Sequence, residues 1–381
     1  MRVIHLGSRK IETPTIWIGH DIKNPFHVWE RLQNCPGIIL SAYQFRERKW
    51  FQQAASSKGV HHALRFRGPV FLDSGGFQLQ QQKARGTEAA EVLNLNFAVR
   101  PDLGAILDFP LDPRSPSSIN SRRWRMTTRT TEFMIARSNG LRFVPVVHAL
   151  SPGILESRTK AMQKLFPDPP LWCLGSMVPL LKGSFIGSRY KKSRWHDSAL
   201  GRRWHLVASL VLRMRASIGD QPLHVFGAGS LSNIFLLLLA GADSVDSSAW
   251  RLKATFGAIQ LPGLAERYLS YRKDHTRARK VITKRCKEIL AQCQCPICQN
   301  LKLEQRISQL RRHFQARATH NAFVLISEIA AVREAAQLGK MKEFIVSRLS
   351  GSPCHKEIAE TVILPLLTAN QLSLNNIPPN N

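Results

Sequence analysis

The stretch that decides the fold is Pro69-Val70-Phe71-Leu72-Asp73-Ser74-Gly75-Gly76-Phe77-Gln78. Its first four residues are apolar and predict a buried strand, which stops at the carboxylate of Asp73 and is followed by two glycines. Glycines at such a point let another molecule approach the backbone closely. A carboxylate, an open backbone, an aromatic ring (Phe77) and an amide (Gln78) together suit a pocket that holds a planar heterocycle and moves protons on it. We therefore expect one side of a ligand site here.

Seven further apolar runs of the same kind occur along the chain, with helical or polar segments between them. They cover residues 15–19, 37–41, 104–108, 143–148, 171–175, 223–227 and 242–246. Runs that are apolar throughout, rather than alternating, are typical of strands buried on both faces of a parallel sheet. Eight such strands with helices between them over roughly 250 residues predict an α/β fold of the (β/α)8 TIM-barrel type.

The placement of polar residues favours this barrel over a doubly wound open sheet. Acids, glycines and a histidine stand at or just past the C-terminal ends of the runs: Asp73, Asp108, His148, Gly175, Gly229 and Asp246. In a barrel these ends converge on one mouth, where active sites form. We therefore expect Asp73 and Asp246 to face each other across a single opening.

Changes in composition suggest three parts of the chain. Residues 1–270 are expected to form the barrel, with a basic and aromatic insertion around residues 183–204. Residues 271–350 read as a helical, zinc-binding subdomain, and residues 351–381 as a C-terminal tail.

The charge balance predicts a polyanionic partner. The chain has 54 Lys and Arg against 26 Asp and Glu, a formal net charge of +28. Many of these positive residues fall in clusters. Aromatic residues are interleaved with them around Trp124 and along residues 182–204, and a third cluster covers residues 272–287. Basic residues mixed with aromatic ones suit phosphates and unstacked bases, so we favour a nucleic acid over a solvated surface or a membrane surface.

The same sequence gives no sign of membrane insertion or export. It contains no apolar run of about 18 residues, and its first residues lack the apolar core of a secretory signal. Three of the seven cysteines lie within six residues, a spacing that favours metal binding over disulfides. A reducing compartment, the cytoplasm, is therefore expected.

Cys293-Gln-Cys295-Pro-Ile-Cys298 predicts the metal site. Three thiolates this close in sequence can bind one tetrahedral Zn²⁺. His320 is our preferred fourth ligand, with His313 and Cys286 as alternatives. Four protein ligands leave no open position for water, so the zinc is expected to be structural.

These motifs resemble those of the tRNA-guanine transglycosylases. The resemblance rests on the stretch 73–78, on the C-x-C-x2-C motif with a later histidine, and on three segments similar to the archaeal enzymes: residues 174–180, 224–229 and 241–250. The family implies a (β/α)8 barrel with an inserted zinc subdomain, and an enzyme that exchanges a guanine in a nucleic acid for a 7-deazaguanine base. No ATP or redox cofactor is implied.

The resemblance also implies roles for individual residues. Asp246 matches the nucleophile that holds C1′ of the sugar, and Asp73 would handle protons on the leaving and entering bases. Asp108 would accept hydrogen bonds from the guanine edge, the N–H of Gly175 would serve the exocyclic oxygen, and Phe77 would stack on the base. The base site would comprise Ser74, Gly75, Phe77, Gln78, Asp108, His148, Gly175 and Gly229. The plainer interpretations are helix N-caps for Asp73 and Asp108, and core positions for His148 and Phe77.

The chain departs from the family in ways that bear on the substrate. It ends before the C-terminal RNA-binding modules of the archaeal enzymes, and it has His148 where the bacterial enzymes have Gln. A short, very basic, archaeal-like core is most similar to the DpdA-type DNA-guanine transglycosylases, which insert 7-cyano-7-deazaguanine into DNA.

DNA is therefore the expected substrate, with tRNA as the alternative. A non-catalytic nucleic-acid-binding subunit is a further reading. A duplex DNA substrate would imply an ATPase partner that separates its strands. The sequence does not decide whether the protein forms a homodimer.

Overall fold

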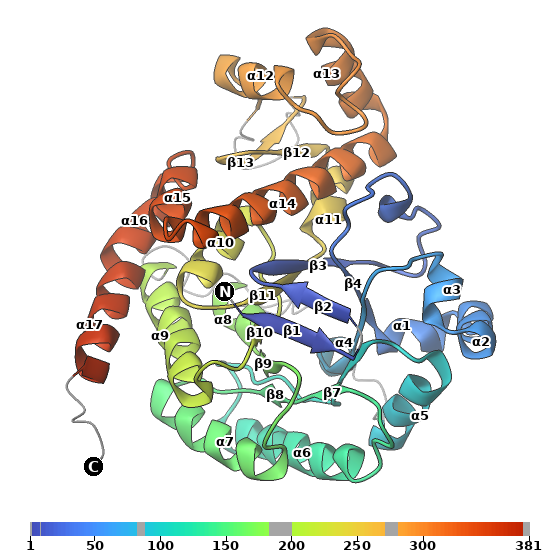
Figure 1. Cartoon of the computed structure of the whole chain (residues 1–381), viewed down its shortest axis with the longest axis vertical. Helices are drawn as coiled ribbons and strands as arrows, with labels where there is room; N and C mark the ends of the chain where they lie inside the picture. Colours follow the sequence, from blue (N-terminus) through green and yellow to red (C-terminus); the bar gives the residue numbers. More distant parts are fainter. Residues whose placement is uncertain (1, 8, 82–87, 183–199, 271–280, 376–381) are drawn as a thin grey trace.

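The computed structural model describes residues 2–7, 9–81, 88–182, 200–270 and 281–375 (Figure 1). Its centre is a ring of parallel strands that includes all eight predicted runs. The strands are β3 (Thr15–Gly19), β4 (Ile38–Ser41), β5 (Val70–Asp73), β6 (Leu103–Ala105), β7 (Phe143–Val144), β8 (Val146–Val147), β9 (Trp172–Leu174), β10 (Leu223–Val225) and β11 (Ser244–Ser247). The predicted TIM-barrel architecture is confirmed.

The ring closes through a single interrupted strand. The order of hydrogen-bonded neighbours is β7-β6-β5-β4-β3-β11-β10-β9-β8. β7 and β8 flank Pro145, which has no N–H for the ladder, so the predicted strand over residues 143–148 is split in two. Its first half pairs with β6 and its second half with β9, which excludes an open sheet.

Helices surround this ring on the outside (Figure 1). Those between the strands are α1 (Ala42–Glu47), α2 (Lys49–Lys58), α3 (Val60–Leu64), α4 (Gly76–Gln81), α5 (Ala89–Val99), α6 (Ser117–Ile135), α7 (Pro152–Leu165), α8 (Met177–Lys182), α9 (Leu200–Ile218) and α10 (Leu231–Leu239), with the short 3₁₀ helix η1 (Val28–Glu30) after β3. α10 shows why they pack there, because all of its residues except Asn233 are buried. None of the helices in the described part of the chain is long and apolar enough to cross a bilayer.

An N-terminal hairpin that the sequence did not reveal closes the bottom of the barrel. β1 (Val3–Leu6) and β2 (Arg9–Glu12) pair antiparallel. Ile4, Leu6 and Ile11 of the hairpin share one apolar cluster with the side chains inside the ring, including Trp17 and Phe71. The interior is therefore filled from below, and among the described residues the barrel opens at the C-terminal ends of its strands.

A second hairpin and the last helices follow β11. α11 (Ala249–Thr255) leads into β12 (Ala258–Leu261) and β13 (Leu264–Tyr268), then α12 (Lys284–Ala291), α13 (Leu303–Arg312) and the long α14 (Phe314–Gln337). The hairpin shares an apolar cluster with three of the cysteines, and α14 contacts both α11 and β12.

The C-terminal segment is more regular than a tail. α15 (Met341–Arg348), α16 (Pro353–Ile358), a short π-helix (Ala359–Ile363) and α17 (Leu364–Asn375) occupy it. The reason is that Ile358, Ala359 and Ile363 pack into the main core. Most of the basic insertion expected around residues 183–204, and residues 271–280 of the third basic cluster, lie outside the described residues.

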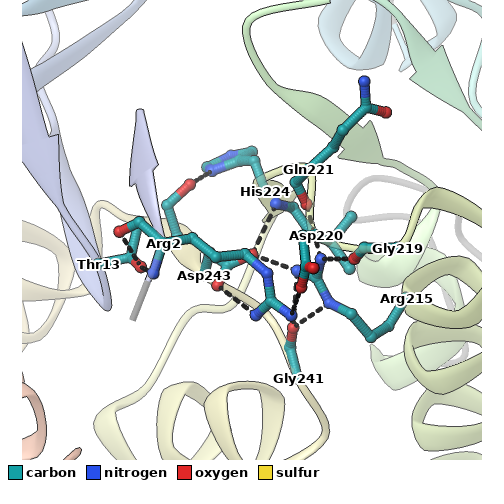
Figure 2. A network of polar contacts seen from close by, with 11 residues as sticks. Arg2, Thr13, Arg215, Gly219, Asp220, Gln221, His224, Gly241 and Asp243 are labelled. Carbon is teal, nitrogen blue, oxygen red and sulfur yellow. Dashed lines mark hydrogen bonds and ion pairs between the residues drawn. The ribbon is translucent and has the colours of Figure 1, made fainter. Parts of the chain in front are cut away.

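Asp243 ties the strands and the N-terminal hairpin together at the bottom of the barrel. Figure 2 shows Arg2 and Arg215 reaching its carboxylate from two sides. Asp243 Oδ2 also accepts the backbone N–H of Leu223 at 2.9 Å. Arg215 in turn donates to the carbonyls of Gly219, Gln221 and Gly241. Because Asp243 precedes β11 at the end away from the mouth, its role is structural.

We expect Asp243→Ala to lower the free energy of unfolding by about 3 to 5 kcal/mol, because it leaves the largely buried guanidinium of Arg215 without this carboxylate. Asp220→Ala is the matched control. Asp220 also contacts Arg2, but its side chain is fully exposed, so its loss should cost no more than about 1 kcal/mol. Urea denaturation of the two variants measures both values, and equal losses would contradict this account.

Candidate active site

The predicted strand-end residues meet in one cavity at the barrel mouth. The cavity has a volume of about 1010 Å³. Its wall includes all three predicted acids and four of the other predicted site residues: Asp73, Asp108, Asp246, Phe77, Gln78, Gly175 and Gly229. Asp73 and Asp246, which are far apart in the sequence, therefore lie on one wall, as the barrel predicted.

Asp73 is the acid whose titration the site alters most. It is the last residue of β5, and its Oδ2 accepts the N–H of Gly75 at 3.1 Å. Burial first, and then the nearby charge of Asp108, raise the pKa of Asp73 from 3.8 to about 7. A carboxyl group with this pKa can both donate and accept a proton near neutral pH, as a general acid and base must.

The raised pKa of Asp73 predicts a pH-dependent stability. Unfolded Asp73 titrates near 3.8 and the folded residue near 7, so between these values only the folded state holds the proton. Stability is therefore full below about pH 4 and falls as the pH rises to about 7. Over this range the free energy of unfolding should fall by an amount on the order of 2 kcal/mol, which is less than the full pKa shift implies because the side chain is only half-buried. We expect Asp73→Asn, which is neutral at every pH, to remove this fall. Denaturant titrations of both proteins from pH 4 to 8 measure this, and parallel stability curves would contradict it.

Asp108 is held from below by two side chains. Ser74 Oγ donates to Asp108 Oδ1 at 2.5 Å, and Nε2 of His148 lies 2.9 Å from Asp108 Oδ2 in ion-pair contact. Gly76 is required here because a Cβ at this position would lie 2.1 Å from the Asp108 carbonyl oxygen. The Ser-Gly-Gly turn after β5 thus places one acid, Asp73, on the wall and braces a second.

Asp246 is oriented by the loop after β10. The N–H of Gly227 donates to Asp246 Oδ1 at 2.7 Å, and Nε2 of the fully buried His224 lies 3.6 Å from the same oxygen. Gly227 has a φ of 79°, in the left-handed region that favours glycine. Its backbone can therefore turn its N–H toward the carboxylate.

Four residues of the predicted base site make contacts within the protein. The N–H of Gly175 is already bonded to the Val147 carbonyl at 3.0 Å, so it is not free for an exocyclic oxygen. His148 is fully buried and reaches Asp108 and Ser176 instead of the cavity. Ser74 and Gly75 likewise lie behind the wall, where they support Asp108 and Asp73.

Two residues of the site went unnoticed in the sequence. His20, directly after β3, lines the cavity while its ring is buried against His27 and Trp29. His224 lies inside β10 beneath Asp246. Each is a lone histidine in an apolar run, a pattern that is more often a core position than a site residue.

The cysteine motif and His320 form one compact cluster of four ligand atoms. Nδ1 of His320 lies 3.4, 3.6 and 3.8 Å from the Sγ atoms of Cys293, Cys295 and Cys298. Bond lengths of about 2.3 Å to sulfur and 2.0 Å to nitrogen at a tetrahedral zinc would separate these atoms by about 3.6 Å. His320 Nε2 donates to the Gln260 carbonyl at 2.9 Å, which leaves Nδ1 free to bind a metal. These four residues fit a zinc ion, and neither alternative ligand, His313 or Cys286, belongs to the cluster.

The sequence matches a known protein family over most of its length. The family model of queuine tRNA-ribosyltransferases matches residues 2–353. The chain belongs to this family. The predicted family resemblance is confirmed, while the closer resemblance to the DpdA type stays a prediction.

Individual members of the queuine tRNA-ribosyltransferase family match over most of this chain. The tRNA-guanine(15) transglycosylase of Methanocaldococcus jannaschii is 24% identical over 94% of the chain and 50% of that protein. The enzymes of the same name from Archaeoglobus fulgidus and Methanopyrus kandleri are 23% and 26% identical, over 90% and 83% of the chain and 65% and 62% of those proteins. The chain thus spans about half to two thirds of the length of these relatives.

Proposed function

We propose that the protein exchanges a guanine in a nucleic acid for a 7-deazaguanine base through a covalent Asp246–nucleotide intermediate. The observation that carries this proposal is the meeting of Asp73, Asp108 and Asp246 around one cavity at a barrel mouth. Membership of the queuine tRNA-ribosyltransferase family and the archaeal relatives support the same reaction class. A non-catalytic subunit would need neither a nucleophile nor an acid of raised pKa at this place.

The three acids divide the proposed reaction between them. An oxygen of Asp246 attacks C1′, the bond from C1′ to the base nitrogen breaks, and neutral Asp73 gives its proton to the departing base. The incoming base then loses a proton to Asp73 and attacks C1′, which frees Asp246 as a carboxylate. Asp108 accepts N–H groups of a guanine-type edge, which an adenine cannot supply in the same pattern.

tRNA is the substrate that the relatives support. The matched proteins are named tRNA-guanine(15) transglycosylases. The net charge of +28 and the exposed Arg122, Arg125 and Arg129 along α6 suit any phosphodiester backbone. In either polymer the target nucleotide must leave its stack to reach the cavity. DNA is the second candidate because of the basic, archaeal-like catalytic core.

One assay tests the reaction and chooses between the polymers. Purified protein is incubated with labelled 7-cyano-7-deazaguanine and either total tRNA or plasmid DNA, each also supplied heat-opened. Label in tRNA alone supports the tRNA substrate, and label in DNA alone supports the DNA-guanine transglycosylase reading. Absence of label from both polymers, with the protein folded and metal-loaded, would overturn the proposed function.

We also propose that Cys293, Cys295, Cys298 and His320 hold one structural zinc ion. Four protein ligands complete its shell, so the ion would fix the fold and take no part in base exchange. The fit of the four ligand atoms supports this proposal.

A further inference from the structure

Two fully buried histidines lie beneath two of the acids in the same arrangement. His148 follows β8 and His224 lies in β10. In each case Nδ1 lies 2.9 Å from a serine Oγ, that of Ser176 for His148 and that of Ser244 for His224. In each case Nε2 faces a carboxylate oxygen, at 2.9 Å for Asp108 and 3.6 Å for Asp246. The barrel thus contains two Ser–His–Asp chains that point toward its mouth.

The hydrogen bonds around Ser176 assign the tautomer of His148. Ser176 Oγ accepts the N–H of Leu111 at 2.8 Å, so its own O–H is available for Nδ1 of His148. The remaining proton of the neutral ring then lies on Nε2, facing Asp108. Ser176 has a φ of 66°, a left-handed conformation that is strained for a serine and that this contact helps to explain.

The surroundings of His224 favour the same tautomer. Its ring meets Phe71 and Phe226 edge-on, at centroid distances of 5.5 and 4.5 Å, which fixes the direction in which Nε2 points. If Nδ1 carried the proton, the lone pair of Nε2 would face the Asp246 carboxylate and be repelled by it. With the proton on Nε2, the ring instead points a donor at the acid, although Nε2 has no hydrogen-bond partner in this structure.

We propose that His224 is a positioning residue that steadies the nucleophile Asp246 through Nε2–H, with Ser244 holding the ring, just as His148 and Ser176 steady Asp108. This inference rests on the proposed function for the identity of the nucleophile. Two groups face Asp246 Oδ1, the Gly227 N–H and Nε2 of His224, and together they orient the carboxylate.

Several other groups share this electrostatic environment and stay unchanged in the test. Asp73 is influenced by the charge of Asp246, and so is the buried thiol of Cys173 on β9. Asp108 acts on the same two groups. The further titratable groups on the cavity wall are His20, Lys253, Glu266, Tyr268 and His355.

The kinetic test uses three variants and single-turnover formation of the covalent intermediate. We expect His224→Phe to slow this step by roughly 10- to 100-fold, as loss of an orienting partner does at metal sites, and to move the acidic limb of its pH profile to higher pH. His224→Gln, which keeps an N–H donor, should recover much of the rate, and KM should change little. Ser244→Ala, a smaller change that keeps the ring, should show the same shift of the limb to a lesser degree.

Either of two results would overturn the inference. One is a His224→Phe profile that superimposes on that of the unmodified protein after scaling by the folded fraction from thermal unfolding. If this variant does not fold, an unshifted profile for Ser244→Ala has the same force.

A second measurement is independent of turnover and separates this inference from the proposed function. In ¹⁵N-histidine NMR spectra of the whole protein, His224 should carry its proton on Nε2 at neutral pH, and Asp246→Asn should shift that resonance. A proton on Nδ1 would refute the proposed contact from His224 to Asp246 even if base exchange occurs. A proton on Nε2 together with no exchange would support this contact and refute only the proposed reaction.

Discussion

Asp246→Asn is expected to abolish base exchange, with a fall of at least about 10⁴-fold, because an amide cannot serve as the carboxylate nucleophile at C1′. Asparagine has nearly the same shape, and its side-chain oxygen can still accept the Gly227 N–H that Asp246 Oδ1 accepts at 2.7 Å. The fold and the binding of nucleic acid should therefore survive. Incorporation of labelled base and denaturing gels of the protein–nucleic acid adduct measure the loss of exchange. Native gel shifts and thermal unfolding measure the retained binding and the retained fold.

Asp168→Asn is the matched control, since Asp168 is an exposed acid outside the cavity and only accepts a hydrogen bond from Gln221. It should exchange bases at an unchanged rate. Near-normal turnover in the Asp246→Asn protein would rule out Asp246 as the nucleophile. The adduct would then have to form on another acid of the same wall, and Asp73 would be the first to examine.

Loss of the metal is expected to have the largest effect on stability. Structural zinc contributes on the order of 10 kcal/mol to the folding of small zinc domains. Cys298 is fully buried, so Cys298→Ala should lower the metal content from one ion per chain to nearly none. Without the ion, the segment of β12, β13, α12 and α13 loses the link between its three thiolates and His320 of α14. We expect rapid amide exchange there, while the barrel strands stay protected.

Two other cysteines provide controls for the metal prediction. Cys286 is buried in the same apolar cluster but outside the four-ligand group, and Cys354 is exposed on α16. Cys286→Ala and Cys354→Ala should both retain one zinc by elemental analysis. Retention of metal by Cys298→Ala, or a folded and metal-free unmodified protein, would contradict the proposed site.

The barrel was predictable because its strands are short, apolar throughout and regularly spaced. β3 has the predicted bounds, and the other runs differ at their ends by a few residues. An interruption at Pro145 could be expected, since proline has no N–H to donate to a neighbouring strand. The two antiparallel hairpins could not be predicted from the sequence. β1 and β2 are polar on one side and apolar on the other, and only tertiary packing against Trp17 and Phe71 gives them a partner.

The site was predictable where chemistry stands at a strand end. Asp73, Asp108 and Asp246 reach the cavity because parallel strands of a barrel all open toward one mouth. The contacts of the residues behind these acids could not be predicted from residue type. Whether His148 touches the ligand or an acid depends on the depth of its ring, and whether the Gly175 N–H is free depends on the strand register with Val147. The clustering of Cys293, Cys295 and Cys298 was foreseen because thiolates close in sequence lie close in space.

The hairpin of β1 and β2 has a kinetic consequence. The hairpin fills the bottom of the barrel, so in the proposed reaction the departing and the incoming base both pass through the mouth. The sugar bound to Asp246 would lie beside this route. The first ring must then exit before the second enters, while the polymer stays tethered. Double-displacement kinetics follow, with parallel reciprocal plots when the free base is varied at several polymer concentrations. Intersecting lines would contradict this order of events, in which the first base leaves before the second one binds.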